Sequence, residues 1–269
     1  MNQKKIRLGL VGKDVSKSDS ERIHRFILKE WDIACEYENI SVNAEEFDSA
    51  ARYLMGDFDG FNVTIPYKRD IMSYLDGMQG DALVYGAVNT VTASDRQGYN
   101  TDGVGFLLML RAAEIPFEDK KILILGAGGA GRSSAVALKN AGAEVFLYQR
   151  NKEKLAEVCE ELKMRAATNP ESGGYDIIIN STGVGMHDTE GLSPVGVAAF
   201  QGAENAIDLI YKPAESEFLR LAKQAGLRTL NGAAMLFYQA YYSDCIYLDR
   251  KADENEAKTL YKKYLETTP

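Results

Sequence analysis

The sequence predicts an α/β protein of two domains, and three features support this prediction. Short apolar runs of strand length alternate with amphipathic stretches of helix length, a pattern typical of mostly parallel sheets covered by helices. One of these runs, residues 122–125, leads into a glycine-rich segment and then into a helical stretch at 133–140. The chain of 269 residues is also long enough for two domains of moderate size.

Composition excludes several classes of protein. The net charge of −8, with dispersed basic residues, argues against a nucleic-acid partner. No apolar run approaches the ~20 residues of a membrane span, so we expect no membrane partner. The three cysteines, Cys35, Cys159 and Cys245, are far apart and odd in number. This pattern favours reduced thiols in a cytoplasmic protein, with no metal site.

The first part of the chain forms its own alternating pattern. Strands are expected at 6–12, 37–42 and 60–65, followed by a pair at 87–93 and 98–101 around a turn. Helices are expected at 21–31, at 45–55, near Lys68 and at 103–113. The last of these is the candidate connector to the second domain.

The second part continues the alternation after residue 121. Further strands are expected at 145–148, 165–168, 175–180, 206–210 and 227–230, with helices at 152–162 and 216–225. Two final helices, at 233–247 and 254–265, need a surface on which to pack. We expect them to return to the first domain. The predicted domains are therefore 1–103 joined by 233–269, with a mostly parallel sheet, and 104–232, of the Rossmann type.

The glycine-rich segment predicts a dinucleotide site. Such a motif is a weak signal alone, but here it lies between a strand and a helix, with a second strand at the expected distance. Its first, second and third glycines are expected to form a tight turn, to let a pyrophosphate approach the backbone, and to pack the helix on the strand. The helix N-terminus then faces the phosphates. The expected cofactor-binding residues are Gly126, Ala127, Gly128, Gly129, Ala130 and Gly131.

The end of the second strand of this unit favours NADP over NAD. An NAD site usually has Asp or Glu there, whereas this chain has Gln149, Arg150 and Asn151, followed by Lys152 and Lys154. An arginine without a carboxylate suits a 2′-phosphate. The alternative is that Arg150 is a solvated cation at the start of a helix.

Polar residues cluster where the strands of the first domain end, which is where open α/β sheets bind ligands. Their hydroxyls, amides, ammonium and carboxylate suit a polyhydroxylated small molecule. A Lys near an Asp can supply the proton that hydride transfer to a ketone requires. Taken singly, Ser20 could be a helix N-cap, Asn62 a turn residue at a strand edge, and Asp102 a helix cap. The clusters are Ser16, Ser18 and Ser20; Asn62, Thr64 and Lys68; Asn89 and Thr90; and Asn100, Thr101 and Asp102.

Together these pieces resemble the shikimate/quinate dehydrogenase family over nearly the whole chain. The most specific pieces are residues 62–68 (NVTIPYK) and 100–103 (NTDG). The others are 18–20 (SDS), 86–90 (GAVNT), 126–131, 180–182 (NST), 185–186 (GM), 208–213 (DLIYKP), 231–232 (NG), 235–236 (ML) and Gln239.

The resemblance implies reversible reduction of 3-dehydroshikimate to shikimate with NADPH, a step of aromatic amino acid biosynthesis. It implies Lys68 and Asp102 as the catalytic pair, which also contact substrate. It implies Arg150, Asn151 and Lys154 at the 2′-phosphate, and Thr182, Gly232 and Met235 near the nicotinamide. The remaining substrate-binding positions that it implies are Ser18, Ser20, Thr64, Asn89, Tyr211 and Gln239.

The sequence also departs from the family pattern. Lys17 and Glu21 stand where the family usually has His and Pro around the serines, Gln149 to Asn151 replace the usual Asn-Arg-Thr, and Gly183 stands where Pro is common. Two alternatives therefore stay open: a quinate or shikimate dehydrogenase that accepts NAD as well as NADP, and a relative that senses NADP(H) or a cyclic acid without turnover. We expect a monomer or a homodimer.

Overall fold

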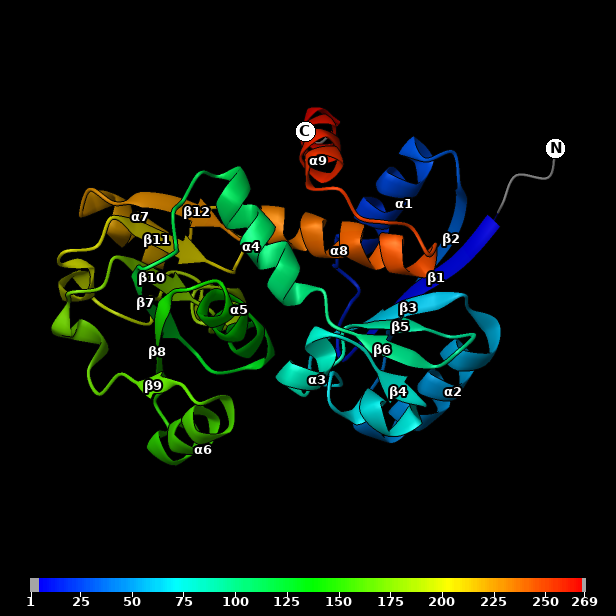
Figure 1. Cartoon of the computed structure of the whole chain (residues 1–269), viewed down its shortest axis with the longest axis horizontal. Coiled ribbons are helices and arrows are strands. Elements are labelled where there is room, and N and C mark those ends of the chain that lie inside the picture. Colours follow the sequence, from blue (N-terminus) through cyan, green and yellow to red (C-terminus); the bar gives the residue numbers. More distant parts are fainter. Residues whose placement is uncertain (1–4, 268–269) are drawn as a thin grey trace. The chain divides into compact units, whose positions relative to one another are not determined.

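The computed structural model describes residues 5–267, and the chain divides into two compact units (Figure 1). Unit 1 comprises Met1–Gly105 and Leu236–Pro269, and unit 2 comprises Phe106–Met235. Residues 1–4 and 268–269 of the expected first domain lie outside the described residues. Within residues 5–267, no helix is both long and apolar enough to cross a membrane.

Unit 1 is built on a six-stranded sheet. The strands are β1 (Lys5–Gly12), β2 (Ala34–Ser41), β3 (Gly60–Val63), β4 (Gly77–Met78), β5 (Thr90–Thr92) and β6 (Gln97–Tyr99). Their order is β2-β1-β3-β5-β6-β4. β1 pairs in parallel with β2 and β3, β4 pairs in parallel with β6, and β5 is antiparallel to both of its neighbours. The sheet is thus mostly parallel, as the sequence predicts.

Unit 1 contains the α-helices α1 (Ser20–Glu30), α2 (Phe47–Asp57), α3 (Asp81–Tyr85) and α9 (Glu254–Glu266), and most of α8 (Ala233–Tyr247). Only the start of α4 (Asp102–Ala112) belongs to it. α1 packs on β1 and β2, α2 packs on β1 and β3, and α9 packs on α1. The two C-terminal helices therefore return to the first unit (Figure 1).

Unit 2 has a six-stranded sheet that is parallel throughout. Its strands are β7 (Lys121–Leu125), β8 (Glu144–Tyr148), β9 (Arg165–Ala166), β10 (Ile177–Asn180), β11 (Asn205–Asp208) and β12 (Arg228–Asn231). The order β12-β11-β10-β7-β8-β9 is the Rossmann order, in which the strand sequence reverses between β7 and β10. Ligands of open α/β sheets bind at the carboxyl ends of the strands beside such a reversal.

The helices of unit 2 cover this sheet, and its strands are buried. α5 (Gly129–Asn140) packs on β7 and β8, α6 (Lys152–Leu162) on β8 and β9, and α7 (Glu217–Gln224) on β11 and β12 (Figure 1). Residues 122–124 and 177–179 have no exposed surface. Strands buried in this way explain the short apolar runs of the sequence.

The helix expected near Lys68 begins two residues later and is a short 3₁₀ helix, not an α-helix. The chain there makes turns and then a short 3₁₀ helix, Asp70–Tyr74, and the carbonyl of Lys68 accepts a hydrogen bond from Val88 N at 2.8 Å. In an α-helix that carbonyl would accept from the N–H of residue 72, but Met72 N donates to the carbonyl of Arg69 at 3.1 Å. Neither β4 nor α3 was predicted from the sequence.

Several other predicted boundaries also shift. The strands expected at 87–93 and 98–101 are shorter, as β5 and β6. After β6, Asn100 Oδ1 accepts from Asp102 N at 3.0 Å, where the chain turns into α4. The strand expected at 175–180 begins at Ile177. The helix expected at 133–140 begins at Gly129, since the glycine segment itself forms its first turn.

Candidate active site

Lys68 and Asp102 form a close, largely buried pair in unit 1. Lys68 Nζ lies 2.5 Å from Asp102 Oδ2, and the two side chains are 16% and 9% exposed. Lys68 lies in the turn that follows β3, and Asp102 is the first residue of α4. A salt bridge so shielded from water holds the ammonium in place while leaving part of it accessible to a ligand.

Asn89 fixes the orientation of the Asp102 carboxylate. Its Nδ2 donates to Asp102 Oδ1 at 2.9 Å and to Thr101 Oγ1 at 3.0 Å. Its Oδ1 accepts from Thr101 N at 2.9 Å and from Thr90 Oγ1 at 2.8 Å. Because a backbone N–H can only donate, the amide cannot be flipped without losing this pairing. The carboxylate is therefore held by Asn89 on one oxygen and by Lys68 on the other.

Gly105 lets α4 and α8 approach closely. A Cβ at this position would lie 2.7 Å from Gln239 N and 2.9 Å from Gln239 Cα. This contact brings Gln239 beside the same cluster, where its Oε1 lies 3.4 Å from Asn89 Nδ2. Four of the expected site residues, Lys68, Asn89, Asp102 and Gln239, are thus linked in one part of unit 1.

The serine loop between β1 and α1 is also ordered by its own hydroxyls. Ser18 Oγ donates to Ser20 Oγ at 2.9 Å and accepts from Ser20 N at 3.2 Å. Asp19 occupies the N-cap position of α1, so the alternative of Ser20 as the N-cap is wrong. Ser16 instead bonds Asp14 Oδ1 at 2.7 Å. The loop therefore presents Ser18 and Ser20 together.

Neighbouring strand ends connect this loop to the segment that follows β3. Lys13 N donates to the carbonyl of Ile65 at 3.1 Å, and a Cβ on Gly12 would meet Thr64 Cγ2 at 2.5 Å. Thr64 therefore lies beside the start of the serine loop. Asn62 lies within β3 and is 5% exposed, so it is not a turn residue at a strand edge.

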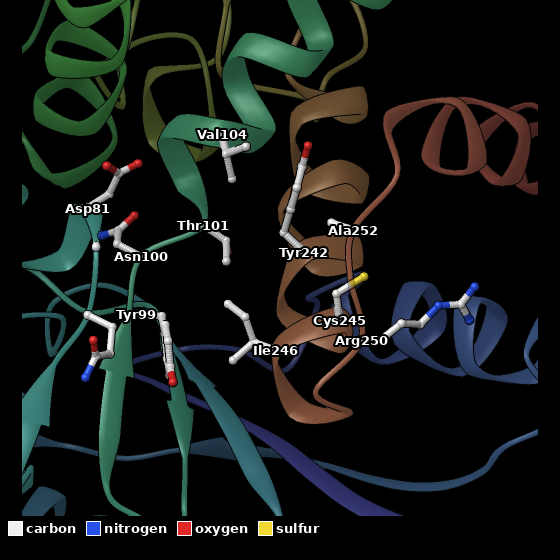
Figure 2. Close-up of a pocket in the computed structure, with 12 residues that line it drawn as sticks. Asp81, Tyr99, Asn100, Thr101, Val104, Tyr242, Cys245, Ile246, Arg250 and Ala252 are labelled. Atoms are coloured by element: carbon white, nitrogen blue, oxygen red, sulfur yellow. The ribbon is translucent and has the colours of Figure 1, made fainter.

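A cavity of about 200 Å³ also lies in unit 1. Of the polar clusters expected from the sequence only Asn100 and Thr101 line it, and none of the substrate-binding positions implied by the family resemblance does. Figure 2 shows Tyr99, Asn100 and Thr101 on one side of this cavity and Tyr242 and Ile246 of α8 on the other. Its lining is mainly apolar, and the catalytic pair is absent from it. The substrate assignment therefore depends on the polar cluster described above and not on this cavity.

The glycine loop of unit 2 fits a pyrophosphate. Gly126 has φ +98°, which only glycine adopts readily. A Cβ on Gly131 would collide with the carbonyl of Gly126 and lie 2.5 Å from Ser181 Oγ, so this glycine packs α5 on the sheet. A Cβ on Gly128 would meet nothing within 4 Å. The turn and the packing contact agree with the sequence prediction, and the space at Gly128 leaves room for a phosphate at the N-terminus of α5.

The segment after β8 exposes its cations. Arg150, Lys152 and Lys154 are all exposed. Asn151 is the N-cap of α6, where its Oδ1 accepts from Lys154 N at 2.9 Å. The cap fixes the start of α6 and so the place of Arg150 just before it, which is compatible with a phosphate contact and also with a solvated cation.

The expected nicotinamide residues follow the strand ends of unit 2. Thr182 Oγ1 donates to Asn180 Oδ1 at 2.7 Å, and Asn180 Nδ2 donates to Asp208 Oδ1 at 3.0 Å. Burial raises the pKa of the Asp208 carboxyl, and hydrogen bonds from Ser216, Ile210 N and Asn180 oppose this shift. This buried carboxyl therefore fixes the loop that carries Thr182.

Three other expected site residues of unit 2, Gly232, Met235 and Tyr211, follow its last two strands. A Cβ on Gly232 would collide with the carbonyl of Leu209, so the glycine allows the turn after β12 to close on the segment after β11. Met235, near the start of α8, is 8% exposed. Tyr211 follows β11, and Lys212 Nζ lies 5.6 Å from the centre of its ring.

The sequence singled out neither Ser243 nor its link to the catalytic cluster. Ser243 Oγ lies 2.8 Å from Thr90 Oγ1 and 3.1 Å from Thr101 Oγ1. One signal could have indicated it: Ser243 follows Gln239 by four residues in a predicted helix, and residues at this spacing lie on the same helix face.

Comparison with known proteins places this arrangement in a family. The family model described as "Shikimate dehydrogenase substrate binding domain" matches residues 10–91. The "Shikimate dehydrogenase (NADP(+))" of Carboxydothermus hydrogenoformans is 35% identical over 246 residues, covering 86% of this chain and 87% of that protein. The corresponding enzyme of Caldicellulosiruptor bescii is 36% identical over 262 residues, covering 90% and 89%.

A solved structure is similar over nearly the whole length. The shikimate 5-dehydrogenase of Thermus thermophilus, solved in complex with NADP(H) and shikimate, has a TM-score of 0.88 and 32% sequence identity, covering 96% of this chain and 99% of that chain. The sequence relatives and the fold thus agree, and the chain belongs to the shikimate dehydrogenase family.

Proposed function

We propose that this chain is an NADP-dependent shikimate dehydrogenase, which reversibly reduces 3-dehydroshikimate to shikimate in aromatic amino acid biosynthesis. The observation that carries the proposal is the 2.5 Å contact between Lys68 and Asp102, set among amide and hydroxyl side chains in a member of this family. Reduction of a ketone needs a proton donor at the carbonyl oxygen, and a partly buried ammonium is suited to that role.

In the proposed mechanism Lys68 handles the proton. The hydride to the carbonyl carbon would come from NADPH when it is bound. The Lys68 ammonium donates a hydrogen bond to the carbonyl oxygen, stabilises the negative charge that develops there, and gives that oxygen a proton to form the alcohol. Asp102 holds the ammonium in position before transfer and favours its return to the charged form by uptake of a proton from water. In the oxidative direction neutral Lys68 accepts the hydroxyl proton.

The other expected residues would hold substrate and cofactor. Ser18 and Ser20, which lie together in one loop, suit the substrate carboxylate. Thr64, Asn89, Gln239 and Tyr211 would bind ring hydroxyls. Glycines and alanines at 126–131 would hold the pyrophosphate, with Arg150, Asn151 and Lys154 at the 2′-phosphate and Thr182, Gly232 and Met235 near the nicotinamide. We further propose that the protein is cytoplasmic and is a monomer or a homodimer. Its mass in solution would distinguish the monomer from the homodimer.

The proposal is tested by following NADPH absorbance with shikimate or quinate, each combined with NADP or NAD. We expect turnover with shikimate and NADP, and a higher kcat/KM for this pair than for the three other combinations. Comparable values with quinate or with NAD would favour a broader quinate/shikimate dehydrogenase. Binding of NADPH without turnover of any pair would reject both enzymes and favour a sensing relative.

Replacing Arg150 with alanine should weaken use of NADP but not of NAD. A charged hydrogen bond to the 2′-phosphate would be lost, so kcat/KM for NADP should fall about 10- to 100-fold while kcat/KM for NAD stays unchanged. Arg220→Ala is the matched control, since Arg220 pairs with Glu217 on the distant surface helix α7. No loss with either cofactor would favour a solvated Arg150, and equal loss with both would place its role at a part that NADP and NAD share.

A further inference from the structure

The hydroxyl of Ser243 on α8 is fully buried and contacts four polar groups. Its oxygen accepts from Asn62 Nδ2 at 3.2 Å and lies 2.9 Å from the carbonyl oxygen of Gln239. A hydroxyl has one proton, and because Thr90 Oγ1 gives its own to Asn89 Oδ1, the Ser243 proton is the one that bonds Thr90 Oγ1. It also lies 2.8 Å from Thr90 Oγ1 and 3.1 Å from Thr101 Oγ1. Because Ser243 has no exposed surface, its hydroxyl depends on these protein groups for hydrogen bonds.

Two of these contacts lead directly to Asn89. Thr90 Oγ1 donates to Asn89 Oδ1, and Thr101 Oγ1 accepts from Asn89 Nδ2. These two bonds, together with the N–H of Thr101, decide which way the Asn89 amide points. The same amide holds Asp102 Oδ1 at 2.9 Å. Ser243 is therefore linked to Asn89 through one threonine hydroxyl, and Asn89 in turn bonds the Asp102 carboxylate.

Helix α8 cannot shift to replace a missing Ser243 hydroxyl. The next residue, Asp244, contacts His24 Nδ1 of α1 at 2.6 Å, and both side chains have no exposed surface. On the other side, Gly105 of α4 packs against the Gln239 backbone with no space for a Cβ. With the helix anchored at both points, loss of the hydroxyl would remove the 2.8 Å contact to Thr90 Oγ1 and leave Thr101 Oγ1 with only a 3.5 Å contact to Gln239 Oε1 on α8.

We propose that Ser243 is a positioning residue for the Lys68–Asp102 pair. Its hydroxyl holds Thr90 and Thr101 so that Asn89 keeps its Nδ2 on Asp102, and it fixes the turn of α8 that carries Gln239. The effect on catalysis rests on the proposed function, whereas the effect on Asn89 does not. Ser243 itself contacts neither Lys68 nor Asp102 in any hydrogen bond among residues 5–267.

The kinetic test compares three variants. Ser243→Ala removes the hydroxyl, and Ser243→Cys keeps nearly the same volume while making only weak hydrogen bonds. Both should lower kcat for shikimate about tenfold, change KM less, and alter the pH dependence of kcat, because the carboxylate is no longer held in one geometry. Tyr241→Phe is the matched control on the same helix, since its hydroxyl bonds Glu256 and the backbone of Asp253 outside the cluster. It should lower thermal stability and leave the pH dependence unchanged.

A second measurement needs no turnover. Hydrogen exchange of the Asn89 side-chain amide, assigned in NMR spectra by its absence in Asn89→Asp, should be slow in the unmodified chain and at least about tenfold faster in Ser243→Ala and Ser243→Cys. Tyr241→Phe should leave it slow. Unchanged exchange in both Ser243 variants would overturn the proposal, whatever happens to kcat. A Ser243→Cys variant that behaves as the unmodified chain in both measurements would also overturn it, because filling the space would then suffice.

The two measurements separate the two proposals. If the unmodified chain turns over no substrate but the exchange of Asn89 responds to Ser243 as expected, the proposed function fails and the positioning role stands. If the chain is an active shikimate dehydrogenase but neither Ser243 variant changes exchange, the function stands and the positioning role fails.

Discussion

Replacing Lys68 with alanine is expected to lower kcat by about 10²-fold or more, which is the contribution that a general acid typically makes. The ammonium is 16% exposed and lies 2.5 Å from Asp102. Its removal deletes the proton donor for the developing alkoxide and leaves a largely buried carboxylate without its cation. Steady-state kinetics with shikimate and NADP, and with 3-dehydroshikimate and NADPH, would measure the loss in both directions.

The split between kcat and KM distinguishes a catalytic Lys68 from a binding one. An interaction made mainly in the transition state lowers kcat, whereas one that binds substrate and transition state equally changes KM alone. A change confined to KM would contradict the proposed role. Lys223→Ala is a suitable control because this exposed lysine pairs with Glu215 on the surface, and it should have kinetics close to those of the unmodified chain.

The glycine loop could be predicted from sequence because its geometry is local. The turn at Gly126 and the packing of Gly131 on the Gly126 carbonyl involve residues five positions apart, so a short stretch of sequence contains both partners. The Rossmann strand order follows from the same kind of information, since alternating strands and helices restrict how a parallel sheet can be connected. The fold class was therefore predictable from patterns along the chain.

The hydrogen-bond network around Lys68 and Asp102 could not be predicted from local patterns. Asn89, Gln239 and Ser243 meet only because α8 returns to unit 1 across about 150 residues of intervening sequence. The spacing of four residues puts Ser243 on the same helix face as Gln239 but does not show which strand ends that face meets, and the family resemblance implied Asn89 and Gln239 but not Ser243. The later start of the helix expected near Lys68 has the same origin, since the carbonyl of that residue is bound by Val88 N, a tertiary contact that local propensity does not contain.

The glycine loop leads to the second large effect, a contrast between Gly131→Ala and Gly128→Ala. A Cβ at position 131 would collide with the Gly126 carbonyl and lie 2.5 Å from Ser181 Oγ. Backbone cannot yield as a flexible side chain does, so we expect this variant to lose about 3 kcal/mol of stability. For a protein of this size that loss corresponds to a fall in Tm of roughly 6–12 °C. NADPH binding should be lost with the distorted turn.

Gly128→Ala should behave in the opposite way. The position is extended, with φ −75°, and a Cβ there would meet nothing within 4 Å, so Tm should stay unchanged. The added methyl group would nevertheless occupy the space proposed for the pyrophosphate, and we expect NADPH affinity, measured by fluorescence titration, to fall at least tenfold.

Normal NADPH affinity in Gly128→Ala would place the phosphates elsewhere, and a normal Tm in Gly131→Ala would show that α5 can move away from the sheet. If the loop both packs the helix and holds the cofactor, Gly131→Ala loses stability, whereas Gly128→Ala loses NADPH affinity and keeps its stability.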